Sequence, residues 1–407
     1  MPELSDRSRR LPESPIRKLV PYAEAAKKRG TKIFHLNIGQ PDVHTPPEFF
    51  QAIQAANPTV LAYSHSAGNE SLRQEIANYY RRHGHELSVN EINVTTGASE
   101  ALGFVFASIM DAEEEVIVPE PFYANYNSFS LANSGNVVPI TTRIEDDFAL
   151  PSIDQFEERI TEKTRAILIC NPGNPTGILY PQESLIRLTE IVKKHDLFLI
   201  ADEVYREFAY DGSVHHSTLG MDEIRNNVVV VDSISKRFSA CGARIGCVVS
   251  RNKELMQSVL KLSQARLSPP TYGQIGAEAV YKLPQSYFEG VVQEYAGRRD
   301  QLRKSLDAIE GVVCPAVNGA FYSMVRLPVD SAEKFCRWML EEFEYEGATV
   351  MMAPGEGFYA TPGLGVDEVR IAYVLNQGDL QAAMACLEAG LIAYPGRKAP
   401  SNAVTTG

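Results

Sequence analysis

The chain has 407 residues, of which 44% are hydrophobic and 22% are charged, a composition typical of a large globular protein with more than one domain. The formal net charge of −12 argues against nucleic acid or an anionic membrane as a partner. No apolar run approaches the roughly 18–20 residues of a membrane helix, and no hydrophobic segment follows the basic N-terminal residues as in a secretory signal. Six scattered cysteines and eight histidines lack the spacings of disulfide frameworks or metal sites, so we expect no metal and free thiols in a cytoplasmic protein.

Short β-branched runs alternate with amphipathic segments from residue 91 to residue 267. We expect strands at 91–97, 115–120, 137–141, 165–171, 197–203, 227–233 and 245–250, and helices at 99–110, 152–159, 181–195 and 252–267. Near-continuous apolar runs and strand–helix alternation indicate an α/β fold with a mostly parallel sheet covered by helices on both faces. Functional residues are then expected at the carboxyl ends of the strands.

The pattern changes near residue 285, where helices at 287–309, 332–346 and 379–389 surround short apolar runs. This texture predicts a smaller α+β domain. We therefore divide the chain into an N-terminal segment that packs on the smaller domain (1–42), a large domain (43–284), a small domain (285–394) and a flexible tail (395–407).

A reactive lysine is indicated by the segment SISKRFSACGARIG (233–246), which follows an apolar strand. Desolvation at a strand end favours the neutral amine of Lys236, the form that condenses with an aldehyde. Ser233 and Arg244 on the same loop suit a phosphorylated aldehyde, because arginine binds phosphate in a bidentate manner. Taken alone, a solvated surface lysine and an arginine in an ordinary ion pair explain the pattern better.

Three further segments place polar residues after predicted strands. Gly97, Ala98 and Ser99 open a helix whose free N–H groups could bind an anion, although they could equally serve as a cap. NPGNPTG (171–177) could present the Asn174 amide, or could be a simple turn. Asp202 in DEVY (202–205) would need a cationic partner if buried, or could be an exposed helix cap.

Together, seven segments resemble the class I/II aminotransferases, which are pyridoxal-5′-phosphate (PLP) enzymes of fold type I, and most closely the bacterial aspartate-aminotransferase-like branch. The segments are GASEA, PFYANY, NPGNPTG, DEVY, SISKRFSACGARIG, NGAFY and VRIAYV. The resemblance runs from about residue 14 to residue 393. It implies a large domain with a mostly parallel central sheet, a smaller α+β domain, PLP as cofactor, and ping-pong transfer of an amino group from an amino acid to a 2-oxo acid.

The resemblance also implies individual roles. Lys236 would form the Schiff base and move the proton, and Asp202 would pair with the pyridine nitrogen. Asn174 and Tyr205 would hold the phenolic oxygen, and Tyr123 would stack on the ring. The phosphate group would be bound by Gly97, Ala98, Ser99, Ser233 and Arg244. Arg370 would grip the substrate carboxylate beside Gly39 and Asn174, and Tyr63 would reach the cofactor of a partner subunit in a homodimer with shared active sites.

The resemblance leaves more than one candidate for the residue that meets the substrate side chain. Ser99 stands where aspartate-selective relatives often carry lysine, and Ser263 stands where others carry arginine. Arg17 and Arg266 remain as candidates, although each could instead form an ordinary surface ion pair. For Arg206 and Arg237 we expect a structural role. We expect an aspartate- or glutamate-like donor. β-Elimination, decarboxylation, racemisation and oxidation on the same fold remain alternatives, as does a PLP-sensing regulator; no GxGxxG motif supports an oxidoreductase.

Overall fold

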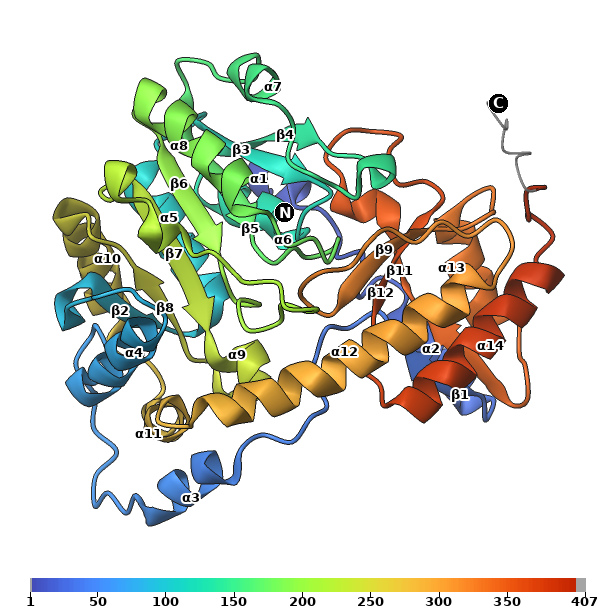
Figure 1. Ribbon diagram of the computed structural model, residues 1–407, viewed down its shortest axis with the longest axis horizontal. Helices are drawn as coiled ribbons and strands as arrows, with labels where there is room; N and C mark the ends of the chain where they lie inside the picture. Colours follow the sequence, from blue (N-terminus) through green and yellow to red (C-terminus); the bar gives the residue numbers. More distant parts are fainter. Residues whose placement is uncertain (1, 400–407) are drawn as a thin grey trace.

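The computed structural model describes residues 2–399, which form a larger and a smaller lobe (Figure 1). The larger lobe contains a seven-stranded sheet in the order β2-β8-β7-β6-β5-β3-β4. β8 runs antiparallel to both of its neighbours, whereas the pairs from β7 to β4 are parallel. The strands are β2 (Ile92–Thr95), β3 (Glu115–Glu120), β4 (Asn136–Thr141), β5 (Thr164–Cys170), β6 (Phe198–Asp202), β7 (Val228–Ser233) and β8 (Gly246–Val249).

Alternate residues of the central strands enter two hydrophobic cores, one on each face of the sheet. In β7, Val228 and Val230 belong to one core, and Val229 and Val231 belong to the other. Because side chains alternate between faces, a strand covered on both sides must be apolar throughout, which explains the run of four valines. The predicted α/β fold with a mostly parallel central sheet is confirmed.

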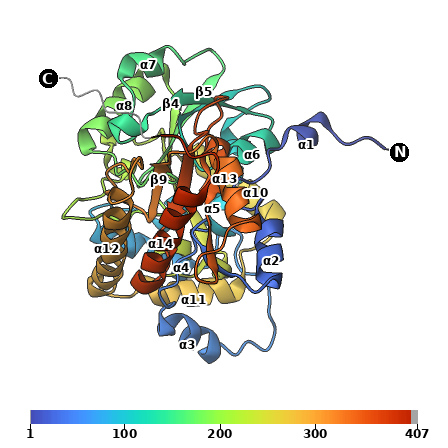
Figure 2. The same ribbon diagram turned by 90° about the vertical axis from the view of Figure 1, so that its right-hand side faces the viewer.

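Helices cover both faces of this sheet (Figures 1 and 2). One core includes side chains of α5 and α10, and the other includes side chains of α4, α8 and α11. The helices of the larger lobe are α3 (Pro47–Ala55), α4 (Glu70–Arg82), α5 (Gly97–Ile109), α6 (Asn125–Ala132), α7 (Ile153–Glu157), α8 (Gln182–His195), α9 (Ile234–Arg237), α10 (Lys253–Arg266) and α11 (Thr271–Tyr281).

The smaller lobe combines two short sheets with helices. β9 (Tyr322–Arg326), β12 (Glu368–Ala372) and β11 (Ala353–Pro354) are antiparallel, and β1 (Lys32–His35) pairs in parallel with β10 (Ala348–Met351). The helices are α2 (Val20–Lys28), α12 (Gln285–Asp307), α13 (Ala332–Glu341) and α14 (Gln377–Ala393). α12 joins the lobes, since its Phe288 lies in a core of the larger lobe and its Leu302 lies in the core of the smaller lobe.

Several boundaries differ from those expected. α13 ends at Glu341 rather than at 346, and Glu346 and Gly347 adopt positive φ in the turn that leads into β10. α1 (Asp6–Arg10) contacts α6 of the larger lobe, whereas only the later part of the N-terminal segment pairs with the smaller lobe. Within residues 2–399, no helix combines the length and the apolar character needed to cross a bilayer.

The start of the expected flexible tail is hydrogen-bonded to the smaller lobe. The Lys398 amide donates to the Pro328 carbonyl at 2.8 Å, and the Asp330 amide donates to the Gly396 carbonyl at 2.9 Å. The lack of apolar periodicity predicts a flexible tail from residue 395, but backbone pairing does not require apolar side chains. Residues 400–407 of that predicted tail lie outside the described residues.

Candidate active site

A cavity of about 500 Å³ lies at the carboxyl ends of β5, β6 and β7. Among its lining residues are all of the predicted site residues except Gly97 and Tyr63. They are Arg17, Gly39, Ala98, Ser99, Tyr123, Asn174, Asp202, Tyr205, Ser233, Lys236, Arg244 and Arg370. The topology explains why they meet: the carboxyl ends of neighbouring parallel strands open at the same edge of a sheet, as expected for a ligand site in such a fold.

Lys236 projects from α9, one turn beyond β7. Its Nζ donates a hydrogen bond to the carbonyl oxygen of Gly39 at 2.7 Å and lies 5.9 Å from the centroid of the Tyr205 ring. The Ser233 hydroxyl accepts from the Ser235 amide at 3.3 Å at the start of this short helix. The amine is therefore held between the two lobes, facing the same space as Tyr205.

Asp202 ends β6 and is only 4% exposed. Its Oδ2 accepts from the Tyr126 hydroxyl at 2.8 Å, and its Oδ1 accepts from the Val204 amide at 3.3 Å. Burial raises the pKa of the Asp202 carboxyl to about 6, although the hydrogen bonds from Tyr126 and Val204 and the charge of Lys236 oppose this rise. No lysine or arginine among the described residues forms an ion pair with it. A buried carboxylate without a cation fits a protonated ring nitrogen of a bound cofactor.

The amino terminus of α5 and Arg244 form an anion-binding corner. Gly97 has φ +76°, and a Cβ at this position would overlap the Arg244 guanidinium. Arg244 donates to the Cys241 carbonyl at 3.1 Å and to the Thr96 carbonyl at 3.4 Å, and it has no carboxylate partner in the described part of the chain. Free N–H groups of the helix and an unpaired guanidinium fit a phosphate group.

Arg370, on β12 of the smaller lobe, is a buried cation at 1% exposure. Its Nη1 donates to the Asn174 Oδ1 at 2.9 Å and its Nη2 donates to the Asn37 carbonyl, while its Nε has no partner. No carboxylate among residues 2–399 pairs with it. Because an unpaired buried charge is unfavourable, this guanidinium fits an incoming carboxylate.

Two tyrosines of the site received no role in the sequence analysis. The Tyr322 hydroxyl lies 2.9 Å from the Tyr205 hydroxyl, and Tyr126 donates to Asp202. A Cβ at Gly39 would overlap the Tyr322 ring, which explains why glycine occupies that position. Both tyrosines lie in segments that carry the family resemblance, NGAFY and PFYANY. The sequence therefore pointed to these segments but not to a role for either tyrosine.

The two arginine candidates for the substrate side chain, Arg266 and Arg17, differ in whether their charge is already paired. Arg266 Nη1 lies 2.5 Å from the Glu100 Oε2 and also contacts the Thr96 hydroxyl, so its charge is already paired at the start of α5. Arg17 lines the cavity and its guanidinium has no hydrogen bond or ion pair within the described residues. Tyr63 does not line the cavity and is 76% exposed.

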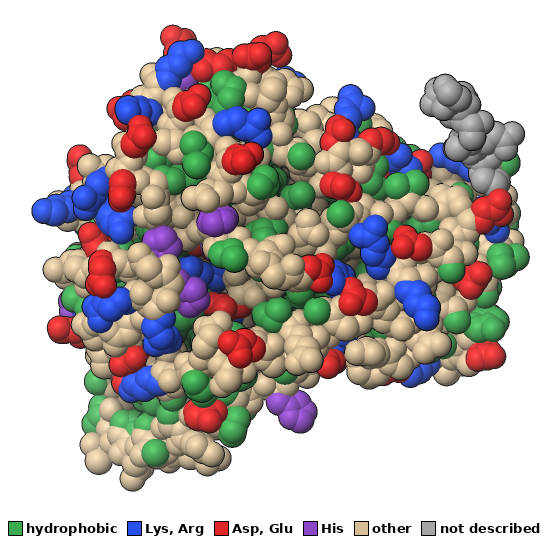
Figure 3. Space-filling view, in the orientation of Figure 1, with side chains coloured by type: hydrophobic (Ala, Val, Ile, Leu, Met, Phe, Trp, Pro, Cys, Tyr) green, Lys and Arg blue, Asp and Glu red, His purple; other side chains and the backbone are tan. Residues whose placement is uncertain are grey.

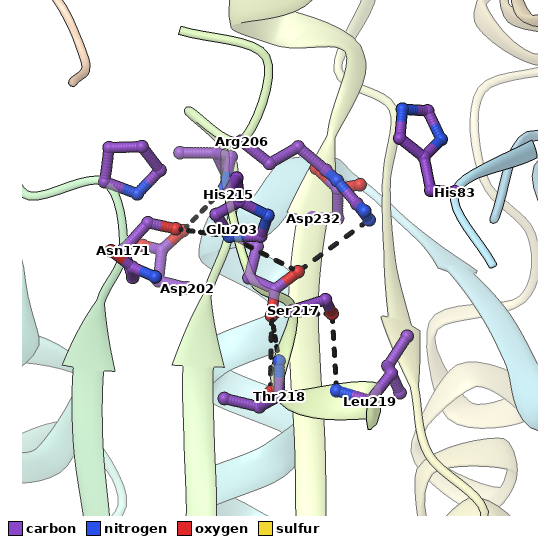
Figure 4. Close-up of polar contacts among 12 residues, drawn as sticks. His83, Asn171, Asp202, Glu203, Arg206, His215, Ser217, Thr218, Leu219 and Asp232 are labelled. Carbon is purple, nitrogen blue, oxygen red and sulfur yellow. Dashed lines mark hydrogen bonds and ion pairs between the residues drawn. The ribbon is translucent and has the colours of Figure 1, made fainter. Parts of the chain in front are cut away.

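Behind the site lies a buried polar cluster (Figure 4). Glu203, which follows Asp202, accepts from the Ser217 hydroxyl at 2.9 Å and from the Thr218 amide at 3.0 Å, and it lies 3.7 Å from Arg206. Arg237 forms a buried ion pair with Asp232. Neither Arg206 nor Arg237 lines the cavity, which agrees with the structural role expected for both.

Comparisons with known proteins agree with this site. The family model described as aminotransferase class I and II matches residues 31–387. Aspartate aminotransferase of Bacillus subtilis (strain 168) is 30% identical over 373 residues, which cover 89% of this chain and 92% of that protein. The structure of aspartate aminotransferase from Thermotoga maritima matches with a TM-score of 0.87 at 29% identity, covering 96% of this chain and 100% of that one. The alanine aminotransferase structure from Pyrococcus furiosus matches with a TM-score of 0.86 at 28% identity, covering 95% and 99%.

The fold and these matches define an α/β enzyme of PLP fold type I. The chain belongs to the class I and II aminotransferase family, and it is a PLP-dependent aminotransferase that transfers an amino group between an amino acid and a 2-oxo acid. Nothing in the comparisons favours elimination, decarboxylation, racemisation or oxidation. When bound, PLP supplies the electron withdrawal that acidifies the Cα–H bond of an attached amino acid.

Proposed function

We propose that PLP is attached to Lys236 and that the amino donor is a dicarboxylic amino acid, aspartate or glutamate. The observation that carries this proposal is the charge of the cavity. Its described lining contains one carboxylate, Asp202, and four cationic side chains, Arg17, Lys236, Arg244 and Arg370. A phosphate group and two substrate carboxylates would balance the three guanidinium groups, and a ring nitrogen would balance the carboxylate.

Each residue then has a defined task. The free Lys236 amine would move the proton between the substrate Cα and the C4′ carbon of the cofactor, while Asn174 and Tyr205 would donate to the phenolic oxygen of the cofactor. Tyr123 stacks on the ring. Gly97, Ala98, Ser99, Ser233 and Arg244 hold the phosphate. Arg370 and Gly39 receive the α-carboxylate, which orients the Cα–H bond toward Lys236.

Arg17 is the residue we assign to the distal carboxylate. Asn37 connects its segment to the carboxylate site, because the Asn37 side chain donates to the Ile16 carbonyl at 2.9 Å and the Asn37 carbonyl accepts from Arg370. Arg266, the other candidate, is already paired with Glu100. The relatives are named for aspartate, aromatic and alanine substrates, so the family fold alone does not select the side chain.

We further propose a cytoplasmic homodimer with shared active sites. The exposed Tyr63 would reach the phosphate of the partner subunit's cofactor, and it lies in an apolar region with Phe50, Val60 and Leu61, which are also exposed. α3 and the segment after it project from the body of the larger lobe, where they could contact a second copy (Figures 1 and 2). All six cysteines are unpaired, as a reducing compartment requires.

The test is a spectroscopic titration of the purified holoenzyme with single amino acids in the absence of an acceptor. Aspartate and glutamate should convert the visible band of the lysine-bound cofactor into the near-ultraviolet band of the aminated cofactor, and a 2-oxo acid should reverse the change. Arg17→Gln should raise the half-saturating concentration of aspartate on the order of tenfold while leaving that of alanine unchanged, because only aspartate carries a second carboxylate.

Two variants serve as controls. Lys236→Ala should lack the visible band altogether, and its persistence would refute the attachment site. Arg9→Gln removes an exposed arginine of α1 outside the cavity and should respond like the unmodified enzyme. If Arg17→Gln weakened the responses to aspartate and alanine equally, Arg17 would not bind the distal carboxylate.

A further inference from the structure

Tyr126 is a buried ionisable group next to the site that the proposed reaction does not use. It lies on α6, its side chain is fully buried, and its hydroxyl donates to the Asp202 Oδ2 at 2.8 Å. Its ring packs in the core on one face of the sheet and meets the Tyr123 ring edge-on at 5.5 Å between centroids. The hydrogen bond therefore joins α6, which begins two residues after the ring-stacking Tyr123, to the end of β6.

Among the described residues, Tyr126 is the one side chain that donates a hydrogen bond to Asp202. The Val204 amide donates to the other carboxyl oxygen at 3.3 Å. The other ionisable groups that face this carboxyl are Tyr123, Cys170, Tyr205, Asp232 and Lys236. Burial raises the pKa of Asp202, and the hydrogen bond from Tyr126 is the largest influence that lowers it.

Tyr126 itself stays protonated over the working range of the enzyme. Burial and the neighbouring Asp202 carboxylate raise the pKa of its hydroxyl well above the usual range. It therefore acts as a permanent donor to Asp202 and never as a competing base.

We propose that Tyr126 is a positioning residue that lowers the basicity of Asp202 and thereby leaves the shared proton on the ring nitrogen of bound PLP. The inference rests on the proposed attachment of PLP at Lys236 with its ring nitrogen at Asp202. A donated hydrogen bond stabilises the ionised carboxylate, so the carboxylate competes less well for the proton. A single proton is shared between the carboxylate oxygen and the ring nitrogen, and no other bond changes.

Loss of the Tyr126 hydroxyl has a consequence that a merely structural residue would not produce. In Tyr126→Phe, Asp202 becomes the stronger base and draws the proton from the ring nitrogen. The ring then withdraws fewer electrons, so the nitrogen that links the cofactor to Lys236 holds its own proton more tightly. The pKa of that nitrogen, which is read from the visible absorption of the holoenzyme against pH, should rise by about one pH unit.

The matched control is Tyr180→Phe. A second variant at position 126 strengthens the hydrogen bond to Asp202 instead of removing it. Tyr180 is a buried tyrosine that lines the same small cavity as Tyr126, and its hydroxyl does not contact Asp202. Its replacement should leave the absorbance pKa unchanged. Site-specific 3-fluorotyrosine at position 126 is nearly isosteric and more acidic, so it should donate a stronger hydrogen bond and lower that pKa. This variant keeps the test informative if Tyr126→Phe folds poorly.

The cofactor-free protein separates the two proposals. With aspartate carboxyl carbons labelled with ¹³C, the Asp202 resonance should titrate at a higher pH in Tyr126→Phe than in the unmodified chain. If neither this titration nor the holoenzyme absorbance shifts, the role of Tyr126 is refuted and the attachment at Lys236 is untouched. If Asp202 shifts but the holoenzyme absorbance does not, the ring nitrogen does not face Asp202. This outcome overturns the role of Tyr126 and the pairing of Asp202 with the ring, while the attachment at Lys236 still stands or falls with Lys236→Ala.

Discussion

Burial of Asp202 at the end of β6 places a carboxyl group where water cannot solvate its charge. Its pKa rises from 3.8 to about 6 in the folded, cofactor-free protein. Between these two values the unfolded chain loses the proton while the folded chain keeps it. Stability therefore falls as pH rises through this interval, and the full loss, of about 3 kcal/mol, remains at higher pH. The residue that serves the cofactor thus destabilises the cofactor-free fold.

Asp202→Asn should consequently stabilise the cofactor-free protein at pH 8, because asparagine carries no charge to bury. The advantage should disappear at pH values below about 4, where both states of Asp202 are protonated. Urea unfolding of the two cofactor-free proteins at each pH measures the difference. Asp307→Asn changes an exposed aspartate of α12 and should give no comparable gain. An Asp202→Asn protein no more stable than the unmodified chain at pH 8 would contradict this account.

At the scale of elements, α5 carries two glycines with different constraints. Gly97 has φ +76° and lies against Arg244, so Gly97→Ala introduces both backbone strain and a clash with the guanidinium. The dissociation constant for PLP, measured by equilibrium titration of the cofactor-free protein, should rise on the order of tenfold or more. An unchanged affinity would show that the start of α5 does not bind the phosphate.

Gly103 provides the matched control on the same helix. A Cβ at Gly103 meets open space, and its φ is not in the left-handed region. Because alanine favours a helix interior by up to about 1 kcal/mol over glycine, Gly103→Ala should bind PLP normally and unfold at slightly higher urea. The two substitutions are chemically identical, so the contrast isolates the role of the helix terminus.

At the scale of the whole molecule, several apolar side chains on α3 and in the segment after it are exposed in the described part of the chain. Leu61 is 59% exposed and lies between the exposed Val60 and Tyr63. Figure 3 shows hydrophobic side chains gathered over this projecting region at the lower left. Exposed apolar surface of this kind is typical of an interface between subunits.

Sedimentation should therefore give a mass twice the 45.0 kDa of one chain. Leu61→Asp should shift the mass toward the monomer and reduce activity, because a buried unpaired carboxylate opposes association and Tyr63 would no longer reach the partner subunit. Ile392→Asp alters an equally exposed residue, 67% accessible, on α14 at the other end of the molecule and should remain dimeric. A monomeric unmodified enzyme would refute the shared site.

The sequence by itself determined the features that depend on local pattern. Apolar runs predict the strands of the central sheet to within a few residues, since burial on both faces requires them. Each motif places its polar residues immediately after one strand, so Asn174, Asp202 and Lys236 were all expected at one edge of the sheet. The helices α2, α3, α4, α6 and α11 received no prediction, although three helices beyond residue 285 did. These helices were recognised only when the structure showed which of their side chains pack against the sheets.

Only the tertiary structure decided which distant groups meet. Tyr126 and Asp202 are 76 positions apart, and Arg370 and Asn174 are 196 apart, yet each pair shares a hydrogen bond. The packing also pairs Arg266 with Glu100, while Arg17 at the cavity has no partner among residues 2–399. The physical reason is that hydrophobic pattern specifies which residues are buried, whereas the partner of a buried charge depends on how separate elements pack together.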